Sequence, residues 1–317
     1  MKVLANDGIS TEGIKAFKNY GFELLENKVA QEQLANFINE NKVEVLLVRS
    51  ATKVRKELID QVPGLKVVGR GGVGLDNIDV SYAKEKGIQV VNTPAASSQS
   101  VAELVFAHIF SLVRFLHDSN RKMPLEGDTK FEQLKKNYAN AIELKGKKMG
   151  VVGFGRIGEE TIKTAISLGM EVLVVDSYVD FKEVDLTFFD GQKISFKLQT
   201  IPMDKMLAEA DFISLHVPAQ DGYLIGEKEI QKMKQGVIIV NAARGGVVDE
   251  KALIDGIENG KIRAAALDVF ENEPKPEMAL LMNEKLSLSP HVGGNTVEAQ
   301  ERIGVELADI VAKIYGK

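Results

Sequence analysis

The chain of 317 residues carries 40 basic and 45 acidic side chains, a formal net charge of -5, and 44% hydrophobic residues. This ordinary composition excludes a disordered or fibrous protein, and the length predicts two domains that each bury a core. The mild acidity argues against a nucleic-acid partner, and the absence of cysteine excludes disulfides, thiolate metal sites and a cysteine nucleophile.

The first third of the chain alternates short apolar runs with helical segments. Three apolar runs predict strands at 43–48, 65–68 and 88–92. Amphipathic spacing between them predicts helices at 53–61 and 80–86. Strands separated by helices of this length indicate a parallel sheet covered on both faces. Because this lobe has few helices of its own, we expect the C-terminal helix to return to it.

A long apolar helix and a polar connector follow. Apolar residues at three-four spacing predict one helix from Ser97 to about Asn120, and its wide apolar face fits either a core helix or a subunit-interface helix. Residues 121–146 are polar and rich in Lys, Asn and Glu, so we expect them to connect two lobes.

A second alternating series begins after the connector. It predicts strands at 148–152, 171–176, 211–215, 236–241, 262–269 and 285–289. It predicts helices at 158–168, 249–259 and from Asn295 to the end. The segment 177–200 has no clear period and fits a loop or a small hairpin. The two series predict an α/β fold of two doubly wound parallel-sheet lobes, one formed by 1–94 with 295–317 and the other by 95–294.

The chain has no sequence typical of export or of a membrane span. Its first apolar run is three residues long, and the most apolar stretch, 101–116, contains Glu103, His108 and Arg114. A membrane-spanning helix needs about 20 apolar residues, and a signal peptide needs a longer apolar core. We therefore expect a cytoplasmic protein with no membrane partner.

A glycine pattern follows the first strand of the second series. The sequence from Gly153 to Gly158 reads G-x-G-x-x-G between a strand and a helix, where dinucleotide-binding domains carry it. Gly153 permits the tight turn, Gly155 lets the backbone approach a pyrophosphate, and Gly158 lets the helix pack on the strand. The backbone N–H groups near Arg156 and Ile157 would hold the phosphates at the helix N-terminus.

An acidic residue ends the second strand of this lobe. Asp176 lies 18 residues past Gly158, close to the ~20 expected for the acid that accepts from ribose hydroxyls. A carboxylate at this position repels a 2′-phosphate. The pattern therefore predicts NAD rather than NADP as the cofactor.

Hydride transfer to a carbonyl needs a proton donor and a cation that fixes the substrate. Of the four histidines, His108 lies inside the apolar helix and is expected to pack there or at an interface, and His117 is expected on a solvated face. His216 follows a strand and fits the edge of a cofactor cleft. His291 follows the last strand, at the sheet edge where α/β domains bind ligands, and is the candidate acid–base.

Arg244 and three acids also follow strands of this lobe. Arg244 lies among small residues after strand 236–241, where it fits either a ligand-binding cation or a structural salt bridge. Asp268, Glu271 and Glu273 lie together after the next strand. Spacing alone does not decide which of these acids pairs with the candidate histidine.

The chain resembles the D-isomer-specific 2-hydroxyacid dehydrogenases over nearly its whole length. The segments that carry this resemblance are 48–53, 69–77, 91–94, 153–158, 241–250, 266–270, 273–274 and 290–294. The resemblance implies a Rossmann-type NAD domain and a flavodoxin-like substrate domain formed by both chain ends. It also implies a homodimer to which the long helix contributes.

The resemblance further implies roles for the matching residues. Arg244 would bind the substrate carboxylate and carbonyl oxygen, His291 would exchange the hydroxyl proton, and Glu273 would orient and charge the imidazole. Asp268 would face the nicotinamide amide. Other cofactor contacts would come from Val73, His216, Val217, Pro218, Ala242, Ala243, Arg244, His291, Gly293 and Gly294. Substrate contacts would come from Arg49, Ser50, Arg70, Gly72 and Val73.

Arg49 and Arg70 would suit a substrate phosphate, because a dianion needs cations beyond Arg244. We therefore expect NAD-dependent oxidation of 3-phospho-D-glycerate to 3-phosphohydroxypyruvate, the entry step of serine synthesis, without a metal. The alternatives are a glyoxylate or hydroxypyruvate reductase, another D-2-hydroxyacid dehydrogenase and, more remotely, an NAD-sensing corepressor-like protein.

Two departures from the family pattern bear on this expectation. The chain ends at Lys317, without the serine-binding regulatory domain of longer members, so we expect no serine feedback by that route. Val73 replaces a frequent threonine, which leaves only a backbone contact at this position.

Overall fold

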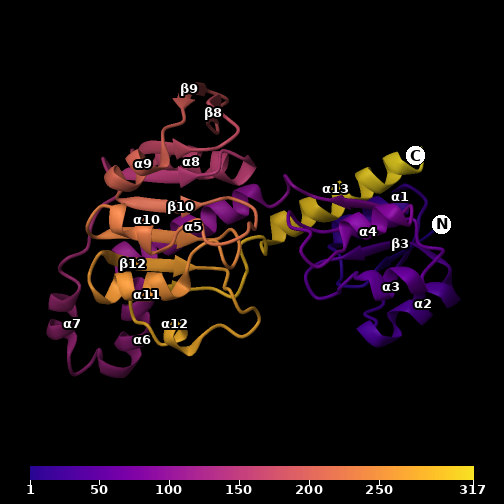
Figure 1. Ribbon diagram of the computed structural model, residues 1–317, viewed down its shortest axis with the longest axis horizontal. Helices are drawn as coiled ribbons and strands as arrows, with labels where there is room; N and C mark the ends of the chain where they lie inside the picture. The colour runs from indigo at the N-terminus through magenta and orange to yellow at the C-terminus, as the bar shows by residue number, and fades with distance from the viewer. The chain divides into compact units, whose positions relative to one another are not determined.

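The structure, a computed structural model, describes all 317 residues and divides the chain into two compact units. Unit 1 comprises Met1–Ser100 and Gly294–Lys317, and unit 2 comprises Val101–Gly293. The expected domain boundaries lay after residues 94 and 294. The yellow C-terminal helix in Figure 1 belongs to the same unit as the indigo N-terminal segment.

Unit 1 is built on a parallel sheet of five strands. In chain order they are β1 (Lys2–Ala5), β2 (Glu23–Leu25), β3 (Val43–Val48), β4 (Val67–Arg70) and β5 (Gln89–Asn92). Their order in space, β2-β1-β3-β4-β5, is that of the flavodoxin-like fold, which confirms the expected architecture of this lobe. The helices of the unit are α1 (Thr11–Asn19), α2 (Leu34–Asn41), α3 (Lys56–Gln61), α4 (Val80–Glu85) and α13 (Val297–Ile314).

The C-terminal helix α13 completes one face of this sheet. Its side chains Ile303, Leu307 and Val311 are buried in one cluster with apolar residues of β1, β3 and β4. It packs closely on α1, because a Cβ placed on Gly13 would lie 2.7 Å from the Cα of Gly304. Only a residue without a side chain allows two helices to approach to this distance.

Unit 2 contains a parallel sheet of six strands. In chain order they are β6 (Lys148–Val152), β7 (Glu171–Val175), β10 (Phe212–Leu215), β11 (Val237–Asn241), β12 (Ile262–Leu267) and β13 (Leu286–Leu288). Their order is β13-β12-β11-β10-β6-β7, and Thr200 forms a further parallel bridge to Val174 of β7. The Thr200 bridge stands where the Rossmann fold has a further strand beside β7. With that bridge counted, the strand order is that of the Rossmann fold, which confirms the second expected lobe.

Helices cover both faces of the unit 2 sheet, as Figure 1 shows. They are α5 (Ser98–Val113), α8 (Arg156–Ser167), α9 (Met203–Glu209), α10 (Glu227–Lys232), α11 (Glu250–Glu258) and the short α12 (Met278–Leu281). Buried apolar residues of α5 and α8 form the core on one face, and those of α9, α10 and α11 form it on the other.

The long helix predicted over 97–120 is in fact two helices, and this prediction was wrong. After α5 the backbone of Phe115 takes a left-handed conformation, φ 56°, which ends the helix. The second helix, α6 (Leu116–Glu126), continues into the segment predicted as a connector, which also contains α7 (Phe131–Asn137). Ion pairs one turn apart, such as Lys122 with Asp118 at 3.0 Å, stabilise such polar helices.

Helix α5 supplies core residues, in agreement with one of its two interpretations. Val105, Ile109 and Leu112 are each at most 2% exposed. No single helix combines the length and hydrophobicity needed to span a membrane, and α5 and α6 reach them only as a pair bent by 54°.

The segment 177–200 forms an antiparallel hairpin, one of the two predicted alternatives. Strands β8 (Phe181–Thr187) and β9 (Lys193–Gln199) pair along their full length and project beyond α8 in Figure 1. Lys182 of the hairpin forms an ion pair of 2.5 Å with Glu159 of α8.

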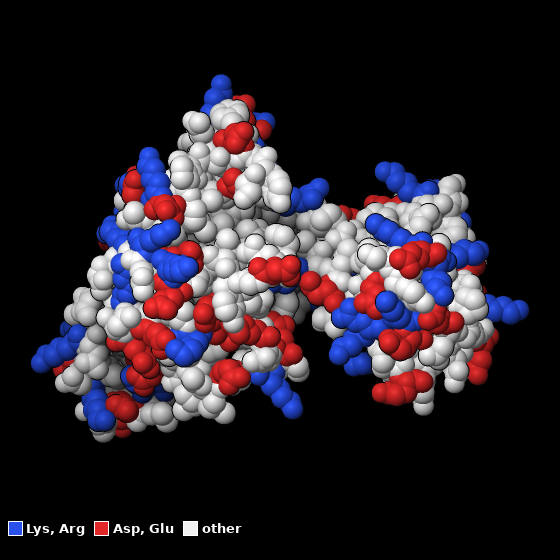
Figure 2. Space-filling model, in the orientation of Figure 1, with Lys and Arg blue, Asp and Glu red and all other residues white.

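All six strands of the unit 2 sheet point in one direction. Their carboxyl ends therefore share one edge, and the loops after β6, β7, β10, β11, β12 and β13 all leave from it. These loops carry the site residues predicted for this unit. On the faces shown in Figure 2, acidic and basic side chains are interspersed over both units.

Candidate active site

The glycine loop joins β6 to α8 and exposes the amino end of that helix. Gly153 has φ 101°, and a Cβ there would meet the carbonyl oxygen of His216. Gly155 precedes the helix without a side-chain cap, and a Cβ there would enter open space. A Cβ on Gly158 would meet the carbonyl oxygen of Gly153. The loop thus leaves room and uncapped N–H groups for a pyrophosphate, as a dinucleotide requires.

Asp176, after β7, binds the glycine loop and its own turn. Its Oδ2 accepts a hydrogen bond from Phe154 N at 2.6 Å, and its Oδ1 accepts from Tyr178 N and Val179 N at 2.8 and 3.0 Å. Partial burial works to raise the pKa of Asp176, but these three N–H groups lower it below its ordinary value. The carboxylate is therefore ionised at neutral pH, as repulsion of a 2′-phosphate requires.

His216, after β10, packs against the glycine loop. Its ring Nε2 lies 2.9 Å from Ser214 Oγ, and its buried Nδ1 has no hydrogen-bond partner. Burial lowers the pKa of His216 to about 3, so the ring is neutral at physiological pH. Val217 lies beside the same glycine loop, 3.4 Å from the position of a Cβ on Gly153.

The neutral ring of His216 predicts a loss of stability in acid. Below pH 6.5 the unfolded chain protonates this ring, whereas the folded chain resists protonation down to about 3, so stability falls as the pH drops through this window. We expect this residue to contribute ~2 kcal/mol to the difference in unfolding free energy between pH 7 and pH 5. Urea unfolding of His216→Gln should show a pH dependence smaller by that amount. His117→Gln is the control, and an unchanged pH dependence in His216→Gln would contradict the prediction.

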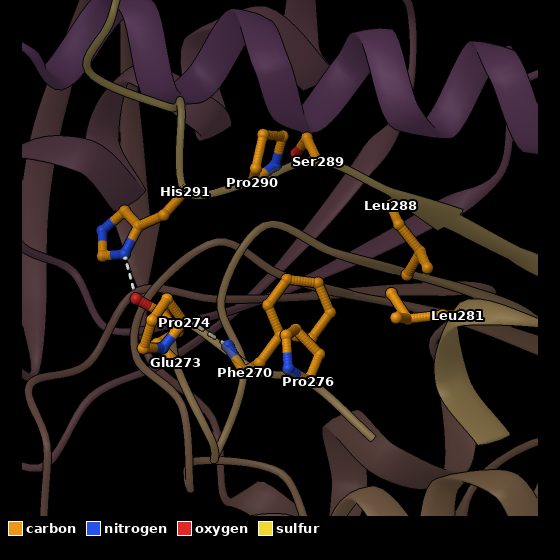
Figure 3. Close-up of a pocket in the computed structure, with 9 residues that line it drawn as sticks. All are labelled: Phe270, Glu273, Pro274, Pro276, Leu281, Leu288, Ser289, Pro290 and His291. Carbon is orange, nitrogen blue, oxygen red and sulfur yellow. Dashed lines mark hydrogen bonds and ion pairs between the residues drawn. The ribbon is translucent and has the colours of Figure 1, made fainter. Parts of the chain in front are cut away.

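His291 and Glu273 form a hydrogen-bonded pair, shown in Figure 3. Nδ1 of His291 lies 2.9 Å from Oε2 of Glu273, whose Oε1 accepts from Phe270 N at 3.1 Å. The His291 side chain is 46% exposed, and its φ of 52° is rare for a residue with a side chain. Because the carboxylate engages Nδ1, Nε2 is the nitrogen that can exchange a proton with a ligand.

The spacing of the three acids left their roles open, and the structure separates them. Glu271 forms reciprocal hydrogen bonds with Glu250, each carboxylate accepting from the other residue's backbone N–H at 2.8 and 3.1 Å. Glu273 is the acid that pairs with His291.

Asp268 supports the turn that carries His291. Its buried carboxylate accepts hydrogen bonds from Ser289 Oγ, Val292 N and Gly293 N at 2.6, 2.8 and 2.9 Å. Its carbonyl oxygen accepts from His291 N at 2.8 Å. The contact of Asp268 with the nicotinamide amide stays a prediction.

Arg244 lies in a turn that contacts the loop of the acid–base pair. Asn241, at the end of β11, fixes the turn by donating from Nδ2 to the Arg244 carbonyl oxygen at 2.9 Å, and Arg244 Nη1 donates to Ala243 O at 2.6 Å. A Cβ on Gly245 would meet the carbonyl oxygen of Phe270, so the two loops touch. Since β11, β12 and β13 are neighbours, Arg244 lies at the same sheet edge as the histidine and its acid.

Two of the substrate residues predicted in unit 1, Arg49 and Ser50, follow β3. The N–H of Arg49 donates to Asp7 Oδ2 at 2.6 Å, and its guanidinium donates from Nη2 to Asn295 Oδ1 at 2.5 Å. Asp7 also accepts from the hydroxyl of Thr52 at 2.6 Å. Asp7 was not predicted from the sequence, although its place two residues after β1, at the carboxyl edge of the sheet, is a usable signal.

The other predicted substrate residues of unit 1 follow β4. Gly72 has φ 137°, and a Cβ there would meet Nη1 of Arg70, so the guanidinium lies against the glycine backbone. The N–H of Gly72 donates to Thr93 Oγ1 at 2.8 Å. That bond leaves the backbone N–H of Val73 as the candidate for the predicted ligand contact in this turn.

A Rossmann unit that presents a glycine loop, a hydrogen-bonded histidine–glutamate pair and an arginine at one sheet edge is typical of nicotinamide-dependent dehydrogenases. The family model "D-isomer specific 2-hydroxyacid dehydrogenase, NAD binding domain" matches residues 106–293. The chain belongs to the D-isomer-specific 2-hydroxyacid dehydrogenase family, which confirms the resemblance and the prediction of NAD as cofactor. Its activity is that of an NAD-dependent D-2-hydroxyacid dehydrogenase.

Two relatives and one solved structure illustrate the similarity. Hydroxypyruvate reductase of Thermotoga maritima is 39% identical over 321 residues, with 99% of this chain and 98% of the relative covered. D-3-phosphoglycerate dehydrogenase of Methanocaldococcus jannaschii is 40% identical over 316 residues, and this chain spans 57% of its length and is itself 99% covered. The crystal structure of D-lactate dehydrogenase from Aquifex aeolicus with NAD and lactic acid has a TM-score of 0.74 and 30% identity, with 100% of this chain and 96% of that chain covered.

Proposed function

We propose that this dehydrogenase oxidises 3-phospho-D-glycerate to 3-phosphohydroxypyruvate, a step that feeds serine synthesis. The observation that carries the chemistry is the 2.9 Å contact between His291 and Glu273, at the sheet edge that also presents Arg244 and the glycine loop. The relatives of about 40% identity that bear the name D-3-phosphoglycerate dehydrogenase support this substrate.

The residues divide the reaction between binding and proton transfer. Arg244 binds the substrate carboxylate and the oxygen on C2, which orients the C2–H bond. Nε2 of His291 takes the hydroxyl proton, and Glu273 stabilises the imidazolium that forms. A bound NAD would supply the acceptor for the hydride of C2. In the reverse direction the protonated His291 returns the proton to the C2 oxygen.

A substrate phosphate adds a dianion that needs cations of its own. Arg49 and Arg70 are the candidates, because both are partly buried and held in place. Asp7 and Asn295 fix Arg49 from its backbone and its side chain, and the guanidinium of Arg70 lies against the backbone of Gly72. Arginines held in this way lose little conformational entropy when they bind a phosphate.

Arg70→Ala tests the substrate assignment. A hydrogen bond to a charged group contributes about 1.5–3 kcal/mol, so we expect KM for 3-phosphohydroxypyruvate to rise by about tenfold or more. KM for unphosphorylated hydroxypyruvate should stay within about twofold, since that acid lacks the phosphate. Initial rates followed by NADH absorbance measure both values, and Lys84→Ala, an exposed cation of the same unit, is the control. A wild-type preference for the unphosphorylated acid would defeat the proposal.

Hydroxypyruvate reduction is the second candidate. The relative from Thermotoga maritima favours this function, because the chain covers 98% of that protein. The chain covers only 57% of the phosphoglycerate dehydrogenase from Methanocaldococcus jannaschii. The same pair of substrates separates the two functions.

A homodimer through α5 belongs to the same proposal. Phe110 of this helix is 40% exposed, and burial by a second copy would remove that apolar surface from water. Light scattering of the purified protein should give twice the mass of one chain.

A further inference from the structure

A chain of hydrogen bonds runs from helix α5 to the loop that carries His291. His108, 6% exposed on α5, places Nδ1 2.8 Å from Ser287 Oγ and Nε2 2.9 Å from Ser289 Oγ. Ser289 Oγ in turn donates to Asp268 Oδ1 at 2.6 Å. Figure 3 shows Ser289 and Pro290 directly beside the helix, with His291 next in the chain. The sequence indicated a packed or an interface residue for His108.

The carboxylate at one end fixes the direction of every bond in this chain. Asp268 accepts, so the hydroxyl proton of Ser289 points to it, and Ser289 Oγ must accept from Nε2–H of His108. A neutral imidazole that donates from Nε2 accepts at Nδ1, which then receives the hydroxyl proton of Ser287. The arrangement assigns one tautomer to His108 and satisfies each polar group.

The ring of His108 must be neutral for this arrangement to hold. Burial lowers the pKa of His108, and the charge of Asp268 opposes that shift only in part. His108 therefore keeps a single ring N–H at physiological pH, and that N–H faces Ser289.

We infer that His108 is a positioning residue, which acts through Ser289 and Asp268 to hold the imidazole of His291 in place for proton transfer. This inference rests on the proposed function, in which His291 exchanges the proton. Asp268 holds the turn by accepting from the N–H groups of Val292 and Gly293. The same turn keeps His291 in its left-handed conformation, which directs the ring to the glutamate.

Removal of the N–H of His108 would release this support. Ser289 Oγ would lose its donor and could rotate its own hydroxyl proton away from Asp268. The carboxylate would keep two of its three donors, so the turn would persist with a less defined orientation. Small errors of position at a reacting group lower the rate strongly while the fold and remote binding are retained.

The test compares three variants of the full chain. In His108→Leu/Ser287→Val both members of the buried pair become apolar. Neither position then holds an unpaired polar group, so the fold should be kept. His108→Gln restores an N–H toward Ser289. Leu112→Ala weakens the packing of the same helix without touching the hydrogen-bond chain. We measure kcat and KM with the D-2-hydroxyacid that the wild type oxidises fastest, and the dissociation constant of NADH.

We expect kcat of the double variant to fall at least about tenfold. Its KM and NADH dissociation constant should stay within about twofold, because the turn persists and the other substrate and cofactor contacts are retained. His108→Gln should recover most of the lost kcat, and Leu112→Ala should keep the wild-type kcat despite its lower stability. Unchanged kcat in the double variant, or an equal loss in Leu112→Ala, would overturn the inference.

A second readout does not depend on turnover. Histidine labelled with 13C at ring Cε1 gives four signals from this chain, since it has four histidines. We expect the His291 signal to move in the double variant and to stay in place in Leu112→Ala, while the His117 signal is unchanged in both. If the wild type oxidises no D-2-hydroxyacid, the proposed function fails, and this signal alone decides the inference. A His291 signal identical to that of the wild type in the double variant overturns it.

Discussion

Arg244→Ala is expected to lower kcat/KM for the hydroxyacid by about 10³-fold, while NADH still binds. The guanidinium is the group assigned to the substrate carboxylate, and loss of one partner from a desolvated charge pair costs about 2–5 kcal/mol. The turn itself should survive, because Asn241 holds its backbone. Initial rates from NADH absorbance and a fluorescence titration with NADH measure the two quantities.

Two further variants make this result specific. Arg244→Lys keeps the charge but loses the planar pair of donors, so its kcat/KM should lie between those of the wild type and the alanine variant. Lys251→Ala removes an exposed cation of the same unit, whose side chain is 86% exposed, and should behave as the wild type. Retention of half the wild-type activity by Arg244→Ala would show that the carboxylate is bound elsewhere.

His291→Gln is expected to lower kcat by about 10²- to 10⁴-fold, the usual contribution of a general acid–base. Glutamine still forms hydrogen bonds but does not exchange a proton at neutral pH, so NADH binding and the unfolding free energy should change little. Glu273→Gln should show a smaller loss, because Nε2 of His291 remains present. The double variant should lose scarcely more than His291→Gln, since the two side chains act as one unit.

Glu271 provides a matched control for Glu273. It lies two residues away in the same loop, and its carboxylate bonds to the backbone of Glu250 rather than to the imidazole. Glu271→Gln should therefore keep the wild-type kcat. A larger loss in Glu271→Gln than in Glu273→Gln would reverse the assignment of the two acids.

The strands of the unit 2 sheet follow from the sequence more closely than those of unit 1. Buried parallel strands such as β11 and β12 read as continuous apolar runs, and amphipathic helices such as α11 separate them. Unit 1 contains β1 and β2, which have only four and three residues. Such strands are too short to show a period, so neither they nor the helices α1 and α2 were predicted.

The break between α5 and α6 shows a different limit. The apolar spacing continues through Leu116, so a pattern alone predicts one helix there. The left-handed backbone of Phe115 depends on its surroundings, in which its ring stacks on that of Tyr138 with centroids 5.6 Å apart. Such a contact between distant residues has no local signal.

The sequence predicted the site residues that follow strands. It did not predict the hydrogen bonds between distant residues that support them. Arg244 and His291 each follow an apolar run, and parallel topology brings such positions to one edge. By contrast, the bond between His108 and Ser287 joins residues 179 positions apart. A buried histidine among apolar neighbours usually indicates packing, so only the folded chain reveals its partners.

The close approach of Gly13 and Gly304 has a consequence for how the chain is made. The first hundred residues leave the ribosome early. The sheet face formed by β1, β3 and β4, on which α13 packs, is not covered by that helix until its last turns have emerged. The Rossmann unit is continuous in the sequence and can acquire its native form while the other is still unfinished. During synthesis the nucleotide-binding unit should therefore mature first, and the flavodoxin-like unit should stay vulnerable to proteases until α13 has emerged.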